Sequence, residues 1–167
     1  MKTRSYLMKN FTPWVLWEKM KKDPDGINCP GIYLITFDKK VLNKAADPTQ
    51  SEIVYVGMTN SKGGIKSRLK QFVCAVRGTK VHSGGSRVRY QIKRNKNFEF
   101  YKKQEELLKN LHISFCAFKC NVKLVSPETL RVMGEVAKHE YYVLSDYLEK
   151  NKCLPRFNDR KLSPRKD

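Results

Sequence analysis

The sequence has few acidic residues and no long apolar run. Its 167 residues contain 16 Asp and Glu against 34 Lys and Arg, which gives a formal net charge of +18. So few carboxylates disfavour a two-metal site, and the excess positive charge favours a polyanionic partner, nucleic acid above all. The longest apolar stretches, such as Ile32 to Phe37, are far shorter than the ~20 residues that span a bilayer. We therefore expect no membrane partner. Because the first residues lack the apolar core of a signal peptide, we expect a cytoplasmic, nucleoid-associated protein.

Cysteine is also scarce, with five residues, an odd number. Together with the expected reducing compartment, this disfavours a disulfide scaffold. His112, Cys116 and Cys120 are spaced by four residues, as some metal ligands are. However, residues 111–118 alternate in the manner of a strand, which would bring too few ligands together to close a zinc shell. We interpret the cysteines as small buried thiols.

The hydrophobic pattern that is present predicts one domain over residues 1–167. The expected fold class is α+β, with a small central mixed or antiparallel β-sheet flanked by helices. The predicted helices cover residues 10–22, 65–77, 99–109 and 128–150, and the predicted strands cover 31–37, 52–57 and 113–125. We expect an N-terminal helical extension (1–28), a basic DNA-contacting insertion (77–97) with a turn at 83–86, and a basic tail (159–167).

Hydrolysis of a phosphodiester needs a group that helps to deprotonate water, a cation that stabilises the phosphorane, and a metal or acid at the leaving oxygen. The order of several sequence features resembles that of the GIY-YIG nuclease superfamily over residues 31–158. These features are Gly31-Ile32-Tyr33, Tyr55-Val56-Gly57, Arg68 within Ser67 to Phe72, Glu140 within Ala137 to Leu144, and Asn158 within Pro155 to Asn158. The resemblance implies a metal-dependent nuclease.

The resemblance also implies a role for each residue. Tyr33 would deprotonate or orient the attacking water, and Tyr55 would lie beside it on the same face of the sheet. Arg68 would stabilise the phosphorane through its planar guanidinium group. Glu140 would bind one Mg²⁺, for which Mn²⁺ can substitute. The supporting residues would be Gly31 and Gly57, where the backbone approaches the site, and Asn158, which would brace the site or contact phosphate.

Each assignment has a plain structural alternative. A strand tyrosine is usually packed in the core, a helix arginine is usually solvated, and an asparagine after a proline is often a turn residue. Glu135 competes with Glu140 for the metal, although the apolar neighbours of Glu140 favour it as the semi-buried residue.

Two features depart from the family pattern. The stretch from Glu140 to Asn158 is longer than the usual spacing, and one position differs in residue type. Phe72 stands one helical turn after Arg68, where many relatives have a His or Tyr, and it cannot exchange a proton. His82 or Tyr90 from the basic segment can fill this place. A tyrosine has an ordinary pKa of ~10 and needs nearby positive charge to act as a base. The cations expected to lower the pKa of the tyrosines are Lys62, Lys66 and Lys70.

The short chain, the basic insertion and the N-terminal extension are similar to those of GIY-YIG type II restriction enzymes. Such enzymes tend to act as dimers on near-palindromic sites. We therefore expect site-specific cleavage of double-stranded DNA by a protein that can form a homodimer. The expected DNA contacts are Arg77, Lys80, Arg87, Arg89, Lys93 and Arg94. Two alternatives remain: a structure-specific or nicking nuclease of repair, recombination or phage origin, and a catalytically inactive DNA-binding module.

Overall fold

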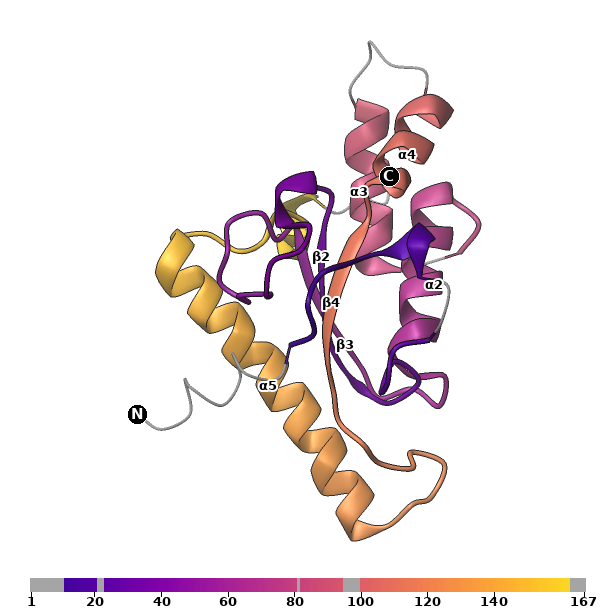
Figure 1. Ribbon diagram of the computed structural model, residues 1–167, viewed down its shortest axis with the longest axis vertical. Coiled ribbons are helices and arrows are strands. Elements are labelled where there is room, and N and C mark those ends of the chain that lie inside the picture. The colour runs from indigo at the N-terminus through magenta and orange to yellow at the C-terminus, as the bar shows by residue number, and fades with distance from the viewer. Residues whose placement is uncertain (1–10, 21–22, 81, 95–99, 163–167) are drawn as a thin grey trace.

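A four-stranded antiparallel sheet forms the centre of the protein (Figure 1). The computed structural model describes residues 11–20, 23–80, 82–94 and 100–162. The strands are β1 (Val15–Leu16), β2 (Gly31–Thr36), β3 (Tyr55–Thr59) and β4 (His112–Ala117), in the order β1-β4-β2-β3. Strands β2 and β4 are therefore central, and β3 has a neighbour on one side only.

Helices cover both faces of this sheet (Figure 1). Helix α5 (Pro127–Asn151) crosses one face, and α2 (Gly64–Arg77), α3 (Ser83–Arg94) and α4 (Phe100–Lys109) form the layer on the other. The predicted α+β fold class, with an antiparallel sheet flanked by helices, is confirmed. Among the residues that the structure describes, no helix is long and apolar enough to cross a membrane.

The central strand β2 is buried along its whole length because both of its faces are covered. Side chains alternate between the faces of a strand. Tyr33 and Ile35 therefore join the core beneath α2 and α3, whereas Ile32 and Leu34 join the core beneath α5. This alternation puts the tyrosine of β2 on the side of α2 and α3, where the candidate site forms.

The predicted N-terminal helix is wrong for the part that the structure describes. Residues Val15–Leu16 form β1, which pairs with β4, and a short 3-10 helix follows at Trp17–Lys19. The reason is that the apolar side chains of this segment serve two cores. Trp14 is buried in the core beneath α5, and Trp17 packs against the opposite core, which an extended segment allows. Residues 1–10 and 21–22 of the predicted extension lie outside the described residues.

The turn predicted at residues 83–86 is also wrong, because this segment is the first turn of α3. The glycines there allow close packing. A Cβ atom at Gly84 would lie 2.6 Å from the ring of Tyr55, and one at Gly85 would lie 2.5 Å from the carbonyl oxygen of Phe72. The basic segment is therefore part of the helical layer, although residues 81 and 95–97 lie outside the described residues. The third predicted strand ends at Ala117 instead of residue 125.

Candidate active site

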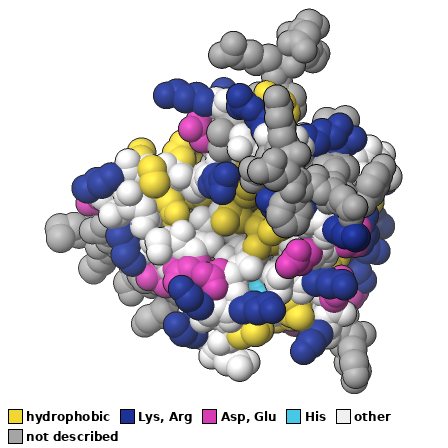
Figure 2. All heavy atoms as spheres, turned by 90° about the horizontal axis from the view of Figure 1, so that it is seen from above, with side chains coloured by type: hydrophobic (Ala, Val, Ile, Leu, Met, Phe, Trp, Pro, Cys, Tyr) yellow, Lys and Arg dark blue, Asp and Glu magenta, His cyan; other side chains and the backbone are white. Residues whose placement is uncertain are grey.

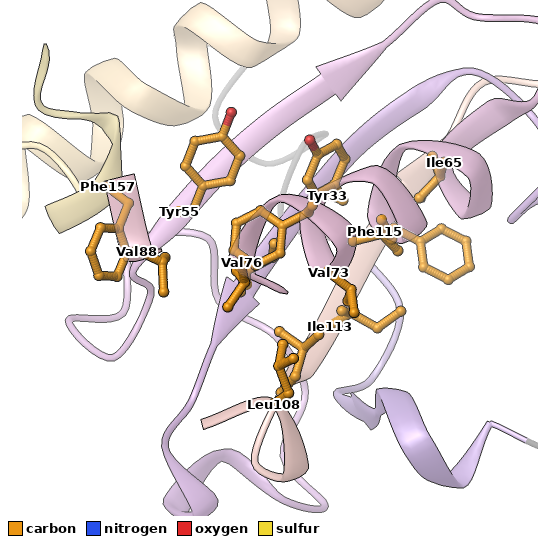
Figure 3. Packing of buried hydrophobic residues seen from close by; sticks show 14 of the residues in the cluster. Tyr33, Tyr55, Ile65, Val73, Val76, Val88, Leu108, Ile113, Phe115 and Phe157 are labelled. Carbon is orange, nitrogen blue, oxygen red and sulfur yellow. The ribbon is translucent and has the colours of Figure 1, made fainter. Parts of the chain in front are cut away.

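Two tyrosines from neighbouring strands lie on the same face of the sheet. In the β2–β3 register Tyr33 faces Gly57 and Ile35 faces Tyr55. The centroids of the two tyrosine rings are 6.1 Å apart, and their hydroxyl groups point the same way, away from Leu108 and Ile113 (Figure 3). The predicted side-by-side placement of Tyr33 and Tyr55 is what the structure shows.

The two glycines predicted to support the site lie at close contacts. A Cβ atom at Gly57 would lie 2.5 Å from the Tyr33 hydroxyl oxygen and 2.8 Å from Cε1 of Tyr55. Gly57 thus leaves the space that both rings occupy. A Cβ atom at Gly31 would collide with the carbonyl oxygen of Cys116, so this glycine allows β2 to lie close to β4.

His82 lies against the tyrosine pair. Its Nε2 is 3.1 Å from the Tyr33 hydroxyl oxygen, and its ring packs edge-on against Phe72, with centroids 5.4 Å apart. The imidazole therefore lies next to the phenylalanine that departs from the family pattern. The other candidate, Tyr90, is elsewhere, with the guanidinium of Arg94 5.4 Å from its ring centroid.

Burial and nearby charges set the protonation states of this pair. Burial, together with the positive charges of Arg68 and Arg87, lowers the pKa of His82 to about 4. His82 is therefore a neutral imidazole at neutral pH. Burial, followed by the effect of Tyr55, raises the pKa of Tyr33 well above 10, whereas Arg68 opposes this change. Tyr33 is therefore a neutral phenol at neutral pH.

The lysines expected to lower the pKa of Tyr33 do not have that effect. Lys66 forms an ion pair with Asp23 at 2.6 Å, and the charge of Lys70 also acts on Asp23. Lys62 is exposed in the loop before α2. The cation that acts on Tyr33 is Arg68, through its charge and a hydrogen bond.

Glu140 reaches the site from α5. Burial raises the pKa of Glu140, and the charge of Arg68 and the backbone N–H of Met58 on the edge strand β3 oppose the rise. The competing residue, Glu135, is exposed and lies 3.4 Å from Nζ of Lys138. Of the two glutamates, the structure therefore places Glu140 beside Tyr33 and Arg68.

Asn158 completes the free edge of β3. Its Oδ1 accepts a hydrogen bond from the Val56 N–H, and its Nδ2 donates one to the Val56 carbonyl, each at 2.8 Å. The preceding Phe157 N–H donates to the Val54 carbonyl at 2.8 Å. Unpaired backbone groups at a sheet edge need such partners. The asparagine thus acts as a brace for the strand that carries Tyr55, one of its two predicted roles.

A pocket of about 520 Å³ opens between α5 and α3. Its polar lining comes from Tyr55, Ser83, Arg87, Glu140, Asn158 and Arg160. The Tyr55 hydroxyl lies 3.4 Å from Oγ of Ser83. Seen from above, Lys and Arg side chains, interspersed with Asp and Glu, lie around a neutral and apolar centre (Figure 2). No separate sequence signal pointed to Ser83, which belonged to a predicted turn, or to Arg160, which belonged to the basic tail.

The predicted DNA-contacting cations fall into three groups. Arg87 lines the pocket and donates to the Phe157 carbonyl at 2.8 Å. Arg77 forms a two-bond ion pair with Glu105 of α4, with both distances 2.9 Å. The guanidinium of Arg89 packs closely against Gly78. Arg77 and Arg89 therefore help to hold the helical layer together. Lys80, Lys93 and Arg94 form the third group and are exposed, as Arg77 is in its ion pair.

The donor atoms at the site fit a magnesium ion bound jointly with substrate. Within the described part of the chain, no group of three or more His, Cys, Asp and Glu side chains comes together. Glu140 offers a single half-buried carboxylate at the pocket. Mg²⁺ commonly keeps several waters and binds through one or two carboxylates plus substrate phosphates. One half-buried carboxylate at the edge of this pocket is consistent with that pattern.

Comparison of the chain with family models, curated proteins and solved structures finds no significant match.

Proposed function

We propose that the protein is a metal-dependent DNA endonuclease of the GIY-YIG type that hydrolyses phosphodiester bonds. One observation carries the proposal: Tyr33, His82, Arg68 and Glu140 come together from β2, the start of α3, α2 and α5. This hydrolysis requires side chains that can accept a proton, a planar cation and a carboxylate. A core built only for packing has no need to assemble them in one place.

The proton from the attacking water would move through Tyr33 to His82. A buried phenol resists ionisation, so Tyr33 would accept the proton of water while it passes its own proton to Nε2 of His82. No free phenolate then forms. This transfer requires the tautomer of His82 with its proton on Nδ1, whereas in the structure the Gly85 N–H donates to Nδ1 at 3.4 Å, so this weak contact must open first. The low pKa of His82 belongs to the protein without DNA. A bound phosphate would oppose the charges of Arg68 and Arg87 and raise this pKa towards its ordinary value.

Arg68 would stabilise the negative charge of the phosphorane through two parallel hydrogen bonds. Glu140 would hold a Mg²⁺ or Mn²⁺ ion. When bound, such an ion would stabilise the charge that develops on the leaving oxygen. Asn158 and Met58 would keep the edge of β3, and thus Tyr55 and Glu140, in fixed positions.

Double-stranded DNA is the proposed substrate, and the net charge of +18 supports a polyanion. We expect site-specific cleavage of the type II restriction kind, by a protein that can act as a homodimer in the cytoplasm. A structure-specific or nicking nuclease would use the same chemistry. The presence of His82 beside Phe72 favours an active enzyme over an inactive DNA-binding module. The test is cleavage of plasmid DNA in Mg²⁺, compared with EDTA and with the Glu140→Gln variant.

A further inference from the structure

The pocket between α5 and α3 has two chemically different walls. One wall carries the polar groups Tyr55, Ser83 and Arg87, with Arg160 near them. The other wall is mostly apolar. It consists of Tyr141, Leu144 and Leu148 from α5, joined by Leu154, with Glu140 and Ser145 as the polar residues of the same helix. Tyr141 is 71% exposed, and Leu148 and Leu154 are 44% and 38% exposed. Large apolar side chains thus stand open to solvent beside two arginines.

Such a wall matches one particular part of a nucleic acid. An intact duplex presents phosphates and the polar edges of its bases, whereas the flat faces of the bases are hidden by stacking. A base face becomes available only when the base leaves the stack. Aromatic side chains next to cations are the usual platform for such bases, since the ring takes the base and the cation takes the phosphate.

We infer that this pocket binds one unstacked nucleotide, with its base against Tyr141 and Leu148 and its phosphate towards Arg87 and Arg160. The volume of about 520 Å³ falls in the range of roughly 300–1,000 Å³ that is common for small-ligand sites. The inference rests on the proposed function in one respect, because it places this nucleotide next to the phosphodiester that Tyr33 and Glu140 act on. The base can come from a site that is already unpaired or can be extruded from a duplex by the enzyme.

Binding in EDTA tests the inference without requiring cleavage. We would compare a matched duplex with the same duplex carrying one unpaired 2-aminopurine. The wild type is expected to bind the bulged duplex about tenfold more tightly, a size typical of stacking one base on an aromatic ring. The fluorescence of the unpaired 2-aminopurine is expected to change on binding. A third duplex with a paired 2-aminopurine tells whether the enzyme extrudes a base or only binds one that is already unpaired. The fluorescence of this duplex rises only where the enzyme extrudes the base.

Two neighbouring tyrosines provide a matched pair of variants. Tyr141→Ala is expected to abolish the preference for the bulged duplex, whereas Tyr141→Phe keeps it. Tyr142→Ala is the control, since Tyr142 lies on the same helix but packs with His139 and Lys138. Equal thermal stability of the two alanine variants would show that folding is intact.

Three results would overturn the inference: equal affinity of the wild type for bulged and matched duplexes, the same loss in the Tyr141 and Tyr142 alanine variants, and dissociation of a dimer by Tyr141→Ala in sedimentation. The last result would assign the apolar wall to a second copy of the chain. A wild type that prefers the bulged duplex but never cleaves DNA would contradict the proposed function and leave this inference standing. A wild type that cleaves DNA but has no preference for the bulged duplex would contradict this inference and leave the proposed function standing.

Discussion

The hydroxyl oxygen of Tyr33 lies 3.1 Å from Nε2 of His82, although 49 positions separate the two residues in the sequence. This contact exists because Gly84 and Gly85 let the start of α3 pack tightly against Tyr55 and α2. In the proposed mechanism this contact would supply a proton acceptor, which Phe72 cannot, when the ring proton of His82 is on Nδ1. His82→Phe should therefore keep the packing but lower the rate of DNA cleavage by about 100-fold or more, a loss typical of a missing acid–base group. Single-turnover kinetics would measure it, and a rate within threefold of the wild type would exclude His82 from the proton path.

The same histidine should make the fold sensitive to acid. Its pKa is about 4 in the folded protein against an ordinary value of 6.5. Between these pH values the unfolded chain binds more protons than the folded one, so stability falls as the pH drops from 6.5 to 4. The difference corresponds to roughly 3 kcal/mol. Urea denaturation at several pH values should show that His82→Phe removes about this much of the acid sensitivity. The pKa of His112 is also lowered. His112 is present in both the wild type and the variant, so its contribution cancels when their stabilities are compared. An equal loss of stability in the wild type and in His82→Phe as the pH falls would contradict the prediction.

Gly57→Ala tests the space that the tyrosine pair needs. The new methyl group would meet the Tyr33 hydroxyl and the Tyr55 ring, so the tyrosines must move. Cleavage should fall by about 100-fold, as is typical of a displacement of about 1 Å in an active site. Stability should fall by about 1–3 kcal/mol from overpacking. Gly134→Ala is the matched control on α5, where nothing lies within 4 Å of the added Cβ atom. It should leave cleavage unchanged and stabilise the helix by about 0.5–1 kcal/mol. Similar cleavage by the two variants would count against the tyrosine pair.

Asn158→Asp tests the brace on the edge of β3. The variant keeps an acceptor for the Val56 N–H. It sets a second oxygen against the Val56 carbonyl, to which Nδ2 of Asn158 donates in the wild type. A loss of about 1–3 kcal/mol in the free energy of unfolding is expected. Asn121→Asp is the control, because Oδ1 of Asn121 accepts from the Lys123 N–H and an aspartate can do the same. Equal stability of both variants in urea denaturation would rule out this role for Asn158.

Local sequence patterns were enough to predict the parts of the fold that bury one regular face. The apolar spacing of Ile65, Leu69 and Phe72 predicted α2, and the β-rich residues around Tyr33 predicted β2. The prediction failed for the segment around Trp14 and Trp17 because the spacing of its apolar residues also suits a helix. Its extended form depends on pairing with β4, a contact that no local pattern reveals.

The candidate site was predictable residue by residue but not as an arrangement. Tyr33, Tyr55, Arg68 and Glu140 carried a recognisable order, and the structure brings them together. The contact of His82 with Tyr33 depends on glycines that looked like a turn and prove to be sites of close packing. The apolar wall at Tyr141 depends on which side of α5 faces the sheet. Both are properties of tertiary packing.

The most direct measurement is cleavage of supercoiled plasmid by the purified protein in Mg²⁺. EDTA and Glu140→Gln serve as tests of the metal and its ligand, and Glu135→Gln serves as a matched control on the exposed side of α5. We predict discrete fragments with the wild type and with Glu135→Gln, and intact plasmid with EDTA and with Glu140→Gln. Cleavage that survives EDTA or Glu140→Gln, or a folded wild type that binds DNA but leaves it intact in both Mg²⁺ and Mn²⁺, would contradict the assignment.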